Sequence, residues 1–397
     1  MTNYRKLFLE HNAQTTFFPL LLEIEKANGV YLWDTQGKQY IDLISGIAVS
    51  NVGHGNKRVI DAITHQVQQY MHLMVYGELV QKPQVLFAQK LCSLLPDNLQ
   101  SVYFVNSGAE AVDGALKLAK RYTGRHQTIS FRNAYHGSTQ GVLSIMGNET
   151  YKNAYRPLIP GNSIIEFGNH DDLDYIDKNT ACVVVETIQG EAGVRIADKA
   201  YFKALQNKCK ANGVLLVCDE IQCGMGRTGK MFAFEHYDII PDILCLSKSL
   251  GGGMPLGAFI SSKDIMKTLA YQPILGHITT FGGHPVCCAA GLEALNYTLD
   301  LKLCESIEEK EKIFKQLLQH PKILEVRGKG LLMAVQFESF EINKKIIDTC
   351  IAKGLLTDWF LFCDSAMRIA PPLTIDTTQI YDACKIIIKS IDEVYAS

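Results

Sequence analysis

The chain lacks the long apolar runs that a membrane helix needs, because no stretch approaches the roughly 18 apolar residues typical of a span. Its N-terminus, MTNYRKLFLEHNAQ, also lacks the apolar segment of a signal peptide. We therefore expect neither export nor insertion into a membrane.

None of the twelve cysteines forms the C-x-x-C spacing of a metal or redox site. Apart from the pair Cys287 and Cys288 they stand singly, most of them among apolar residues, where a thiol packs as a small hydrophobe. The pattern predicts a reducing, cytoplasmic compartment and no metal centre.

Excess basic charge is absent too, since 39 Lys and Arg stand against 41 Asp and Glu, for a formal net charge of −2. A nucleic-acid surface needs clustered positive charge, so we do not expect nucleic-acid binding. With 47% hydrophobic residues in 397, the composition is that of a globular protein with a large core and room for more than one domain.

Short apolar strands alternate with helix-like segments through the middle of the chain. The predicted strands are residues 101–105, 128–131, 181–185, 214–218, 243–246 and 258–261. Helices are expected at 58–70, 83–95 and 199–211, and from 106 onward, where Val112, Ala115, Leu116 and Ala119 have helical spacing. This alternation predicts an α/β fold with a mostly parallel central sheet covered by helices on both faces.

The two ends of the chain differ from this middle part. Residues 29–43 predict two strands joined by a turn, and residues 45–55 predict a loop that enters a buried site. Beyond residue 300, two helices and a strand-like stretch predict a smaller α+β domain. We therefore predict an N-terminal segment (1–50) that packs with the small domain, a large domain (51–300) and a C-terminal small α+β domain (301–397).

Lys248 lies between an apolar strand and three glycines, in ILCLSKSLGGGMPLGA (residues 243–258). Burial disfavours a charged lysine, so a lysine here can become a nucleophile and form a Schiff base with an aldehyde. The glycines would let the backbone approach a cofactor closely. A snorkelling lysine beside a flexible turn fits this stretch equally well.

Asp219 ends the strand that precedes Lys248, and ligands bind at strand ends of parallel sheets. The two residues could form a structural ion pair. They also match pyridoxal phosphate, which needs a lysine for its aldehyde, a carboxylate for its pyridine nitrogen and donors for its phosphate.

The predicted helix start offers the phosphate donors. The backbone N–H groups of Ser107, Gly108 and Ala109 and the positive end of the helix dipole favour a phosphate, although a serine there is often only an N-cap. Tyr135 could stack on the cofactor ring or simply pack in the core.

A competing motif, GMGRTG at residues 224–229, matches the G-x-G-x-x-G of dinucleotide-binding folds. Its glycines do not follow the strand directly, because five residues from Asp219 to Cys223 intervene. No convincing helix follows either, which argues against a nicotinamide cofactor.

Together these stretches resemble the class III aminotransferases of the ornithine, acetylornithine and 4-aminobutyrate group over nearly the whole chain. The matching stretches are GIAVSNVGHG, FVNSGAEAVDGALKLAKRYTGR, NAYHGST, VVVETIQGEAGV, LLVCDEIQCGMGRTG, PDILCLSKSLGGGMPLGA, HITTFGGHP and RIAPPL. The resemblance implies the fold-type I architecture of pyridoxal-phosphate enzymes and a homodimer.

It also implies roles for single residues. Lys248 would form the Schiff base and Asp219 would pair with the pyridine nitrogen. Gln222 would lie beside the phenolic oxygen and Tyr135 would cover one ring face. The phosphate would be held by Ser107, Gly108 and Ala109, and by Thr280 of the neighbouring subunit, so that the two subunits share each active site.

For the substrates, Arg368 would bind the carboxylate of one substrate. Glu191 would shield that arginine when a substrate with a different end group occupies the site. The resemblance implies a ping-pong reaction that carries an amine from a donor to a 2-oxo acid, 2-oxoglutarate in our interpretation. A rival hypothesis is a binding module, or an enzyme that does not transfer the amine, such as a racemase.

The sequence departs from the family at four positions, and two of them, Ile47 and Ser138, bear on the identity of the donor. Ile47 replaces the tyrosine of enzymes that use free ornithine. Ser138 stands where relatives have a carboxylate-binding arginine, and a serine cannot give that bidentate contact, so another cation such as Arg132 must act or the donor lacks the carboxylate. Thr187 for proline and His284 for asparagine alter local geometry. We favour an ω-aminotransferase for acetylornithine or ornithine, with a diamine such as putrescine, or 4-aminobutyrate, as the alternative.

Overall fold

A seven-stranded sheet forms the centre of the computed structural model, which describes residues 3–396. The strand order is β4-β10-β9-β8-β7-β5-β6. The strands are β4 (Ser101–Val105), β5 (Gln127–Phe131), β6 (Asn162–Ile165), β7 (Thr180–Glu186), β8 (Leu215–Asp219), β9 (Ile243–Leu246) and β10 (Gly257–Ser261). Every strand predicted for the middle of the chain is present within one residue of its expected bounds, whereas the edge strand β6 was not anticipated.

The sheet is mostly parallel, as predicted, and β10 is its exception. It pairs antiparallel with both β4 and β9, whereas the pairs from β9 through β8, β7 and β5 to β6 are parallel. The carboxyl ends of the parallel strands therefore meet at one edge of the sheet, where parallel α/β folds bind their ligands.

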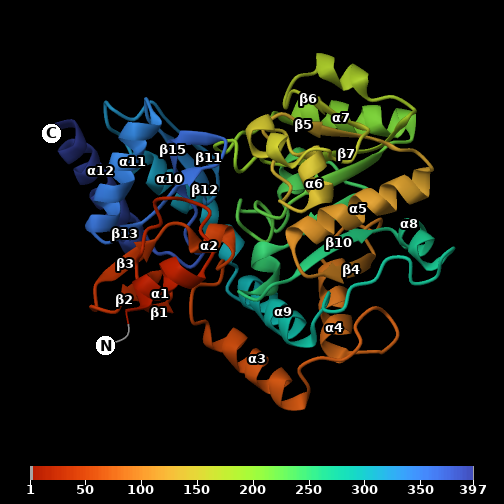
Figure 1. Cartoon of the computed structure of the whole chain (residues 1–397), viewed down its shortest axis with the longest axis horizontal. Helices are drawn as coiled ribbons and strands as arrows, with labels where there is room; N and C mark the ends of the chain where they lie inside the picture. The colour runs from red at the N-terminus through yellow and green to blue at the C-terminus, as the bar shows by residue number, and fades with distance from the viewer. Residues whose placement is uncertain (1–2, 397) are drawn as a thin grey trace.

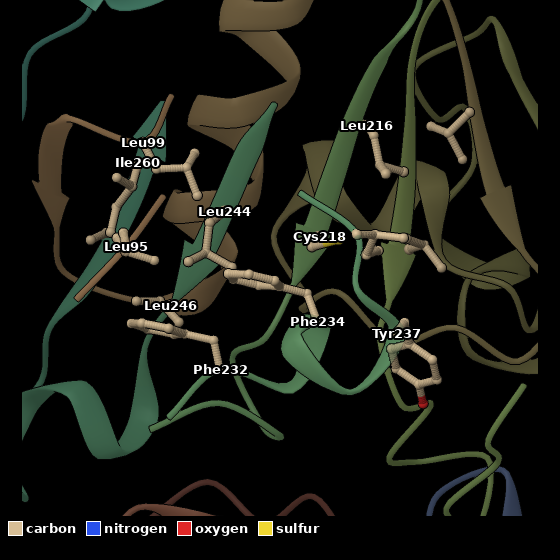
Figure 2. Packing of buried hydrophobic residues seen from close by; sticks show 14 of the residues in the cluster. Leu95, Leu99, Leu216, Cys218, Phe232, Phe234, Tyr237, Leu244, Leu246 and Ile260 are labelled. Atoms are coloured by element: carbon tan, nitrogen blue, oxygen red, sulfur yellow. The ribbon is translucent and has the colours of Figure 1, made fainter. Parts of the chain in front are cut away.

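Alternating side chains give the sheet two buried faces. Leu216, Leu244, Leu246 and Ile260 belong to one core cluster, and their neighbours Leu215, Val217, Ile243, Cys245 and Phe259 belong to the other. Figure 2 shows the first face, where the rings of Phe232 and Phe234 lie beside Leu244 and Leu246. The centroids of these two phenylalanine rings are 5.8 Å apart. Burial on both faces explains why these strands are nearly continuous apolar runs.

Helices cover each face. One face packs against α5 (Gly108–Thr123), α6 (Gln140–Ile145) and α8 (Lys263–Lys267). The other packs against α4 (Lys82–Cys92), α7 (Lys199–Asn212) and α9 (Pro285–Asp300). The four apolar positions predicted to line α5 are all buried. Outside this layer, α3 (Lys57–Gln69) packs on α9.

The two ends of the chain build two smaller sheets, seen together in Figure 1 as the red and blue elements. One has the order β1-β2-β3-β13 and the other β11-β12-β15-β14. Their strands are β1 (Ile24–Asn28), β2 (Tyr31–Asp34), β3 (Gln39–Asp42), β11 (Glu325–Lys329), β12 (Leu332–Gln336), β13 (Leu355–Leu356), β14 (Trp359–Phe360) and β15 (Cys363–Ile369). Strand β3 pairs in parallel with β13, so the first and last parts of the chain share a sheet.

Three helices accompany the C-terminal strands: α10 (Ile307–Leu317), α11 (Phe340–Ala352) and α12 (Thr377–Ala396). The two helices expected beyond residue 300, at 304–320 and 376–395, correspond to α10 and α12. The short α1 (Tyr4–His11) opens the described chain, and α2 (Ser45–Ala48) is a kinked turn inside the stretch predicted as a loop. The domain boundaries at 50 and 300 stay a prediction. Within residues 3–396, no helix is long and apolar enough to span a membrane.

Gly252 is one of the three glycines after Lys248, and it packs against α9. Its φ is +61°, and a Cβ there would lie 2.8 Å from both the carbonyl oxygen of Ala290 and the Cβ of Ala294. Gly252→Ala should therefore lower the free energy of unfolding by about 2 kcal/mol, measured by urea denaturation.

Gly124→Ala is the matched control, because Gly124 has a φ of +68° but no atom within 4 Å of the added Cβ. It should cost about 1 kcal/mol through backbone strain alone. Equal losses in the two variants would contradict the close packing at Gly252.

Candidate active site

A cavity of about 450 Å³ opens where the carboxyl ends of the parallel strands meet. It is lined by Gly108, Ala109, Tyr135, His136, Gly137, Ser138, Thr139, Glu186, Ile188, Glu191, Asp219, Ile221, Gln222, Cys223, Ser247 and Lys248. The structure thus brings seven of the predicted site residues to one cavity: Lys248, Asp219, Gln222, Tyr135, Gly108, Ala109 and Glu191.

Lys248 enters the cavity from the turn that follows β9. It begins the 3-10 helix η5 (Lys248–Gly251) with a φ of +51°, a backbone conformation that non-glycine residues rarely adopt. Burial lowers the pKa of its amine from the usual value, although the carboxylate of Glu191 partly opposes this effect. The neutral, nucleophilic amine is therefore more accessible here than on a solvated lysine.

Asp219 lies at the end of β8 and is held from two sides. Its Oδ1 accepts a hydrogen bond from the backbone N–H of Ile221 at 3.0 Å, and its Oδ2 lies 2.7 Å from Nδ1 of His136. Burial alone would lower the pKa of His136, but the hydrogen bond and charge of Asp219 outweigh it and raise the pKa. The imidazole thus donates to Asp219 and fixes the carboxylate in the cavity.

His136 and Glu186 were not among the predicted site residues. Glu186 ends β7, and it accepts backbone hydrogen bonds from Tyr135 at 2.8 Å and Gly190 at 3.0 Å. Burial, reinforced by Asp219, raises the pKa of Glu186 to about 7. Their positions in the sequence could have identified them, because Glu186 directly follows a predicted parallel strand and His136 follows another by a few residues.

The start of α5 forms another wall of the cavity. Ser107 is the N-cap, and its hydroxyl accepts from the N–H of Glu110 at 3.2 Å, so the N-cap interpretation is confirmed. The first N–H groups of a helix have no partner within it and attract anions. A Cβ at Gly108 would lie 2.8 Å from Cδ1 of Ile221, which explains the glycine at this wall.

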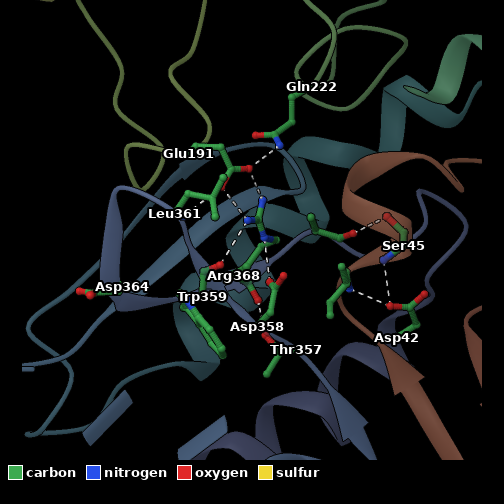
Figure 3. Close-up of polar contacts among 12 residues, drawn as sticks. Asp42, Ser45, Glu191, Gln222, Thr357, Asp358, Trp359, Leu361, Asp364 and Arg368 are labelled. Carbon is green, nitrogen blue, oxygen red and sulfur yellow. Dashed lines mark hydrogen bonds and ion pairs between the residues drawn. The ribbon is translucent and has the colours of Figure 1, made fainter. Parts of the chain in front are cut away.

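Arg368, on β15, is fully buried and reaches the cavity through Glu191. Its Nη1 and Nη2 donate to the two carboxylate oxygens of Glu191, each at 3.0 Å (Figure 3). Gln222 donates to the same carboxylate at 3.0 Å, while its Oε1 is buried without a partner in the described structure. Burial alone would raise the pKa of Glu191, but the charge of Arg368 prevails and brings it to about 2.

Other predicted residues lie outside this cavity. Ile47 is 37% exposed with a φ of +62°, strained for a β-branched side chain. Thr280 is exposed in the loop before α9. Arg132, the alternative cation, pairs with Glu166 and does not line the cavity. Ser138 does line it, and its Oγ lies 3.2 Å from the hydroxyl of Tyr135.

The sequence departures and the glycine-rich motif have local explanations. Thr187 donates to the buried carboxylate of Glu220 at 3.1 Å, a contact that proline could not make. His284 caps α9 by accepting from Val286 at 3.3 Å. The segment of the GMGRTG motif folds as turns around the fully buried Arg227 and opens no helix, so it is not a dinucleotide-binding motif.

Comparisons with known proteins identify the family of the chain. The family model for class-III aminotransferases matches residues 12–391. The chain belongs to this family. As a class-III aminotransferase it is a transaminase, which excludes the binding-module interpretation and supports amine transfer over racemisation.

Curated relatives of this aminotransferase match nearly the whole chain. The chain is 38% identical over 385 residues to an acetylornithine aminotransferase of Methanopyrus kandleri, covering 96% of each chain. It is also 38% identical over 385 residues to an acetylornithine aminotransferase of Methanocaldococcus jannaschii, covering 93% of this chain and 92% of the relative.

Solved structures of similar enzymes have the same fold. An ornithine aminotransferase from Toxoplasma gondii, described with partial occupancy of PLP at its active site, superposes with a TM-score of 0.92 at 31% identity. The match covers 99% of this chain and 94% of that one. A transaminase from a marine Virgibacillus superposes with a TM-score of 0.93 at 25% identity, covering 99% of both chains. The predicted fold class is therefore confirmed.

Proposed function

We propose that this aminotransferase depends on pyridoxal phosphate and moves the terminal amine of an ornithine-type donor, acetylornithine or ornithine, to 2-oxoglutarate. The observation that carries the proposal is the convergence of Lys248, Asp219 and the N-terminus of α5 on one cavity. These supply the three groups that the cofactor needs: an amine, a carboxylate and a phosphate site.

The residues present fit this cofactor. Gln222 Oε1 and His136 Nε2 are buried polar atoms without partners in the described structure, so both can form hydrogen bonds with a bound ligand. Ser107, Gly108 and Ala109 would hold the phosphate, and Gln222 would contact the phenolic oxygen. Such a set of donors and acceptors around one cavity matches a polar aromatic ligand that carries a phosphate.

Each remaining residue has a role toward the ring. Tyr135 would cover one ring face, and Asp219 would hold the proton on the pyridine nitrogen, with His136 keeping the carboxylate oriented. When bound, pyridoxal phosphate would supply an aldehyde that takes up the donor amine and a ring that delocalises the electrons released at the donor carbon.

Lys248 would do the proton chemistry. Its Nζ would hold the cofactor at the aldehyde and, once the donor amine has taken its place there, would move a proton from the donor carbon to C4′. The lowered pKa of Lys248 supports this role because a base must be neutral before it can accept a proton. A ping-pong reaction follows, because the donor product leaves before the 2-oxo acid arrives.

Arg368 and Glu191 would accommodate the two substrates in turn. With Glu191 paired to Arg368, the arginine is masked and an uncharged part of the donor can lie beside it. When Glu191 moves away, the same Nη1 and Nη2 atoms can bind the carboxylate of the 2-oxo acid in bidentate fashion.

We also propose a homodimer with shared active sites. Thr280 is exposed, and apolar neighbours on the same loop are exposed too, with Ile274 at 77% and Phe281 at 55%. Contact with a second copy would cover these side chains. It would also allow Thr280 to complete the phosphate site of the neighbouring subunit.

A second candidate donor is favoured by one observation. Near Ser138 the described lining of the cavity has the hydroxyl groups of Ser138 and Tyr135 and no arginine, which suits a donor without a carboxylate at that end, such as putrescine. The other alternative donor, 4-aminobutyrate, carries a carboxylate, so this observation does not favour it. The two acetylornithine aminotransferases at 38% identity favour the ornithine-type donor.

A donor panel tests the proposal. Purified holoenzyme with 2-oxoglutarate should form glutamate fastest from acetylornithine or ornithine, followed by mass spectrometry and by the change in cofactor absorbance in single turnovers. Enzyme without a donor provides the baseline. Rapid conversion of putrescine or 4-aminobutyrate, with none of either ornithine compound, would overturn the donor assignment.

A further inference from the structure

Arg368 has a second carboxylate partner that the proposed exchange with Glu191 does not use. Its Nε donates to Oδ1 of Asp358 at 2.8 Å, on the opposite edge of the guanidinium from Glu191. Figure 3 shows Asp358 and Glu191 on different sides of Arg368. The arginine is therefore held between two carboxylates, only one of which lines the cavity.

The segment around Asp358 fixes Arg368 at several further points. The backbone N–H of Arg368 donates to the carbonyl of Asp358 at 2.9 Å, and its carbonyl accepts from the hydroxyl of Thr357 at 2.6 Å. Nη2 also donates to the carbonyl of Trp359 at 3.3 Å, and the guanidinium lies 4.4 Å from the ring centroid of Phe360. Each of these contacts comes from residues 357–360 and is independent of Glu191.

The contacts that hold Arg368 differ between the donor and acceptor halves of the reaction. While Glu191 is paired, its two hydrogen bonds alone could hold the guanidinium. Once Glu191 has moved, the guanidinium keeps its contacts with residues 357–360, and among those contacts in the described structure Asp358 is the charged partner. Asp358 binds Nε in a charge-assisted hydrogen bond, so Nη1 and Nη2 stay on the side of Glu191, which lines the cavity.

We propose that Asp358 is a positioning residue that keeps Arg368 aligned for the carboxylate of the 2-oxo acid. It acts in the acceptor half of the reaction and not in the donor half. The inference rests on the proposed function, because it requires a substrate carboxylate to replace Glu191 on Arg368. Preorganisation of this kind improves binding because the arginine need not be ordered when the substrate arrives.

The test separates the two half-reactions. Asp358→Ala should weaken binding of 2-oxoglutarate about tenfold, and Asp358→Asn, which keeps an acceptor for Nε, about threefold. The donor half-reaction should stay within about twofold in both variants. Single turnovers followed by cofactor absorbance give both quantities: the donor alone is added to the holoenzyme, and 2-oxoglutarate is added to enzyme that the donor has already aminated and from which free donor has been removed.

A binding measurement without chemistry provides the second readout. Glutarate has two carboxylates but no oxo group, so its dissociation constant, measured by calorimetry with the holoenzyme, should rise by the same factors. Asp364→Asn is the matched control, because Asp364 is an exposed aspartate of β15 that points away from Arg368 in Figure 3. It should change neither quantity.

Equal losses in donor and acceptor half-reactions would overturn the proposal, since they would make Asp358 a structural residue only. Unchanged glutarate binding in Asp358→Ala would overturn it as well. If wild-type enzyme converts no ornithine-type donor, the donor assignment fails, and the glutarate measurement still decides the role of Asp358.

Discussion

Lys248→Ala should reduce transamination with every donor by about 10⁴-fold or more. The variant loses the amine that would hold the cofactor and move the proton between the donor carbon and C4′. Its fold should remain, because the change removes an ammonium whose burial is unfavourable and breaks none of the core contacts beneath η5. Steady-state rates and the thermal midpoint measure the two effects.

Chemical rescue makes this result specific. A small free amine such as methylamine should restore part of the lost proton transfer in Lys248→Ala, because it can occupy the space left by the side chain. Lys267→Ala, at an exposed lysine on α8, should behave as wild type. Near-normal turnover in Lys248→Ala would remove this lysine from the mechanism.

Asp219→Asn should lower turnover by about 10³-fold while preserving the fold. Asparagine keeps the shape and an acceptor oxygen for His136, so the 2.7 Å contact can survive. The variant loses the negative charge that would hold the proton on the pyridine nitrogen, and with it the electron-withdrawing power of the ring. The pKa of His136 should fall, because Asp219 is what raises it.

A cofactor analogue separates this role from a structural one. Pyridoxal phosphate methylated at its ring nitrogen carries a permanent positive charge and should recover part of the activity of Asp219→Asn. Asp264→Asn, at an exposed carboxylate on α8, serves as the control and should leave the rates unchanged. Asp219→Asn activity close to that of wild type would contradict the assigned pairing.

Much of this architecture follows from local sequence. Buried strands such as β9 are continuous apolar runs, and α5 has its buried residues at helical spacing, so both could be located without a structure. Residues at strand ends, such as Lys248 and Asp219, follow from the general rule for parallel sheets. The cavity they share was therefore predictable in outline.

Contacts between residues far apart in the chain could not be predicted from local sequence. His136 and Asp219 are 83 positions apart. Asp358, just before β14, contacts Arg368 of β15 across a turn of the chain that its own sequence does not reveal. The antiparallel direction of β10 is likewise a property of the sheet, since its own residues resemble those of its parallel neighbours. The placement of Arg132 against Glu166 was also invisible in the sequence.

The pairing of β3 with β13 has a consequence for how the protein is made. Ile41 finds its partner Leu355 only after almost the whole chain has left the ribosome. At typical translation speeds of about 5–20 residues per second, the edge of β3 waits roughly 15 to 60 s without that neighbour. An unpaired edge is a site for wrong associations, so the nascent N-terminal hairpin is where protection by a chaperone would matter most. The enzyme's first strands are thus among the last to reach their native surroundings.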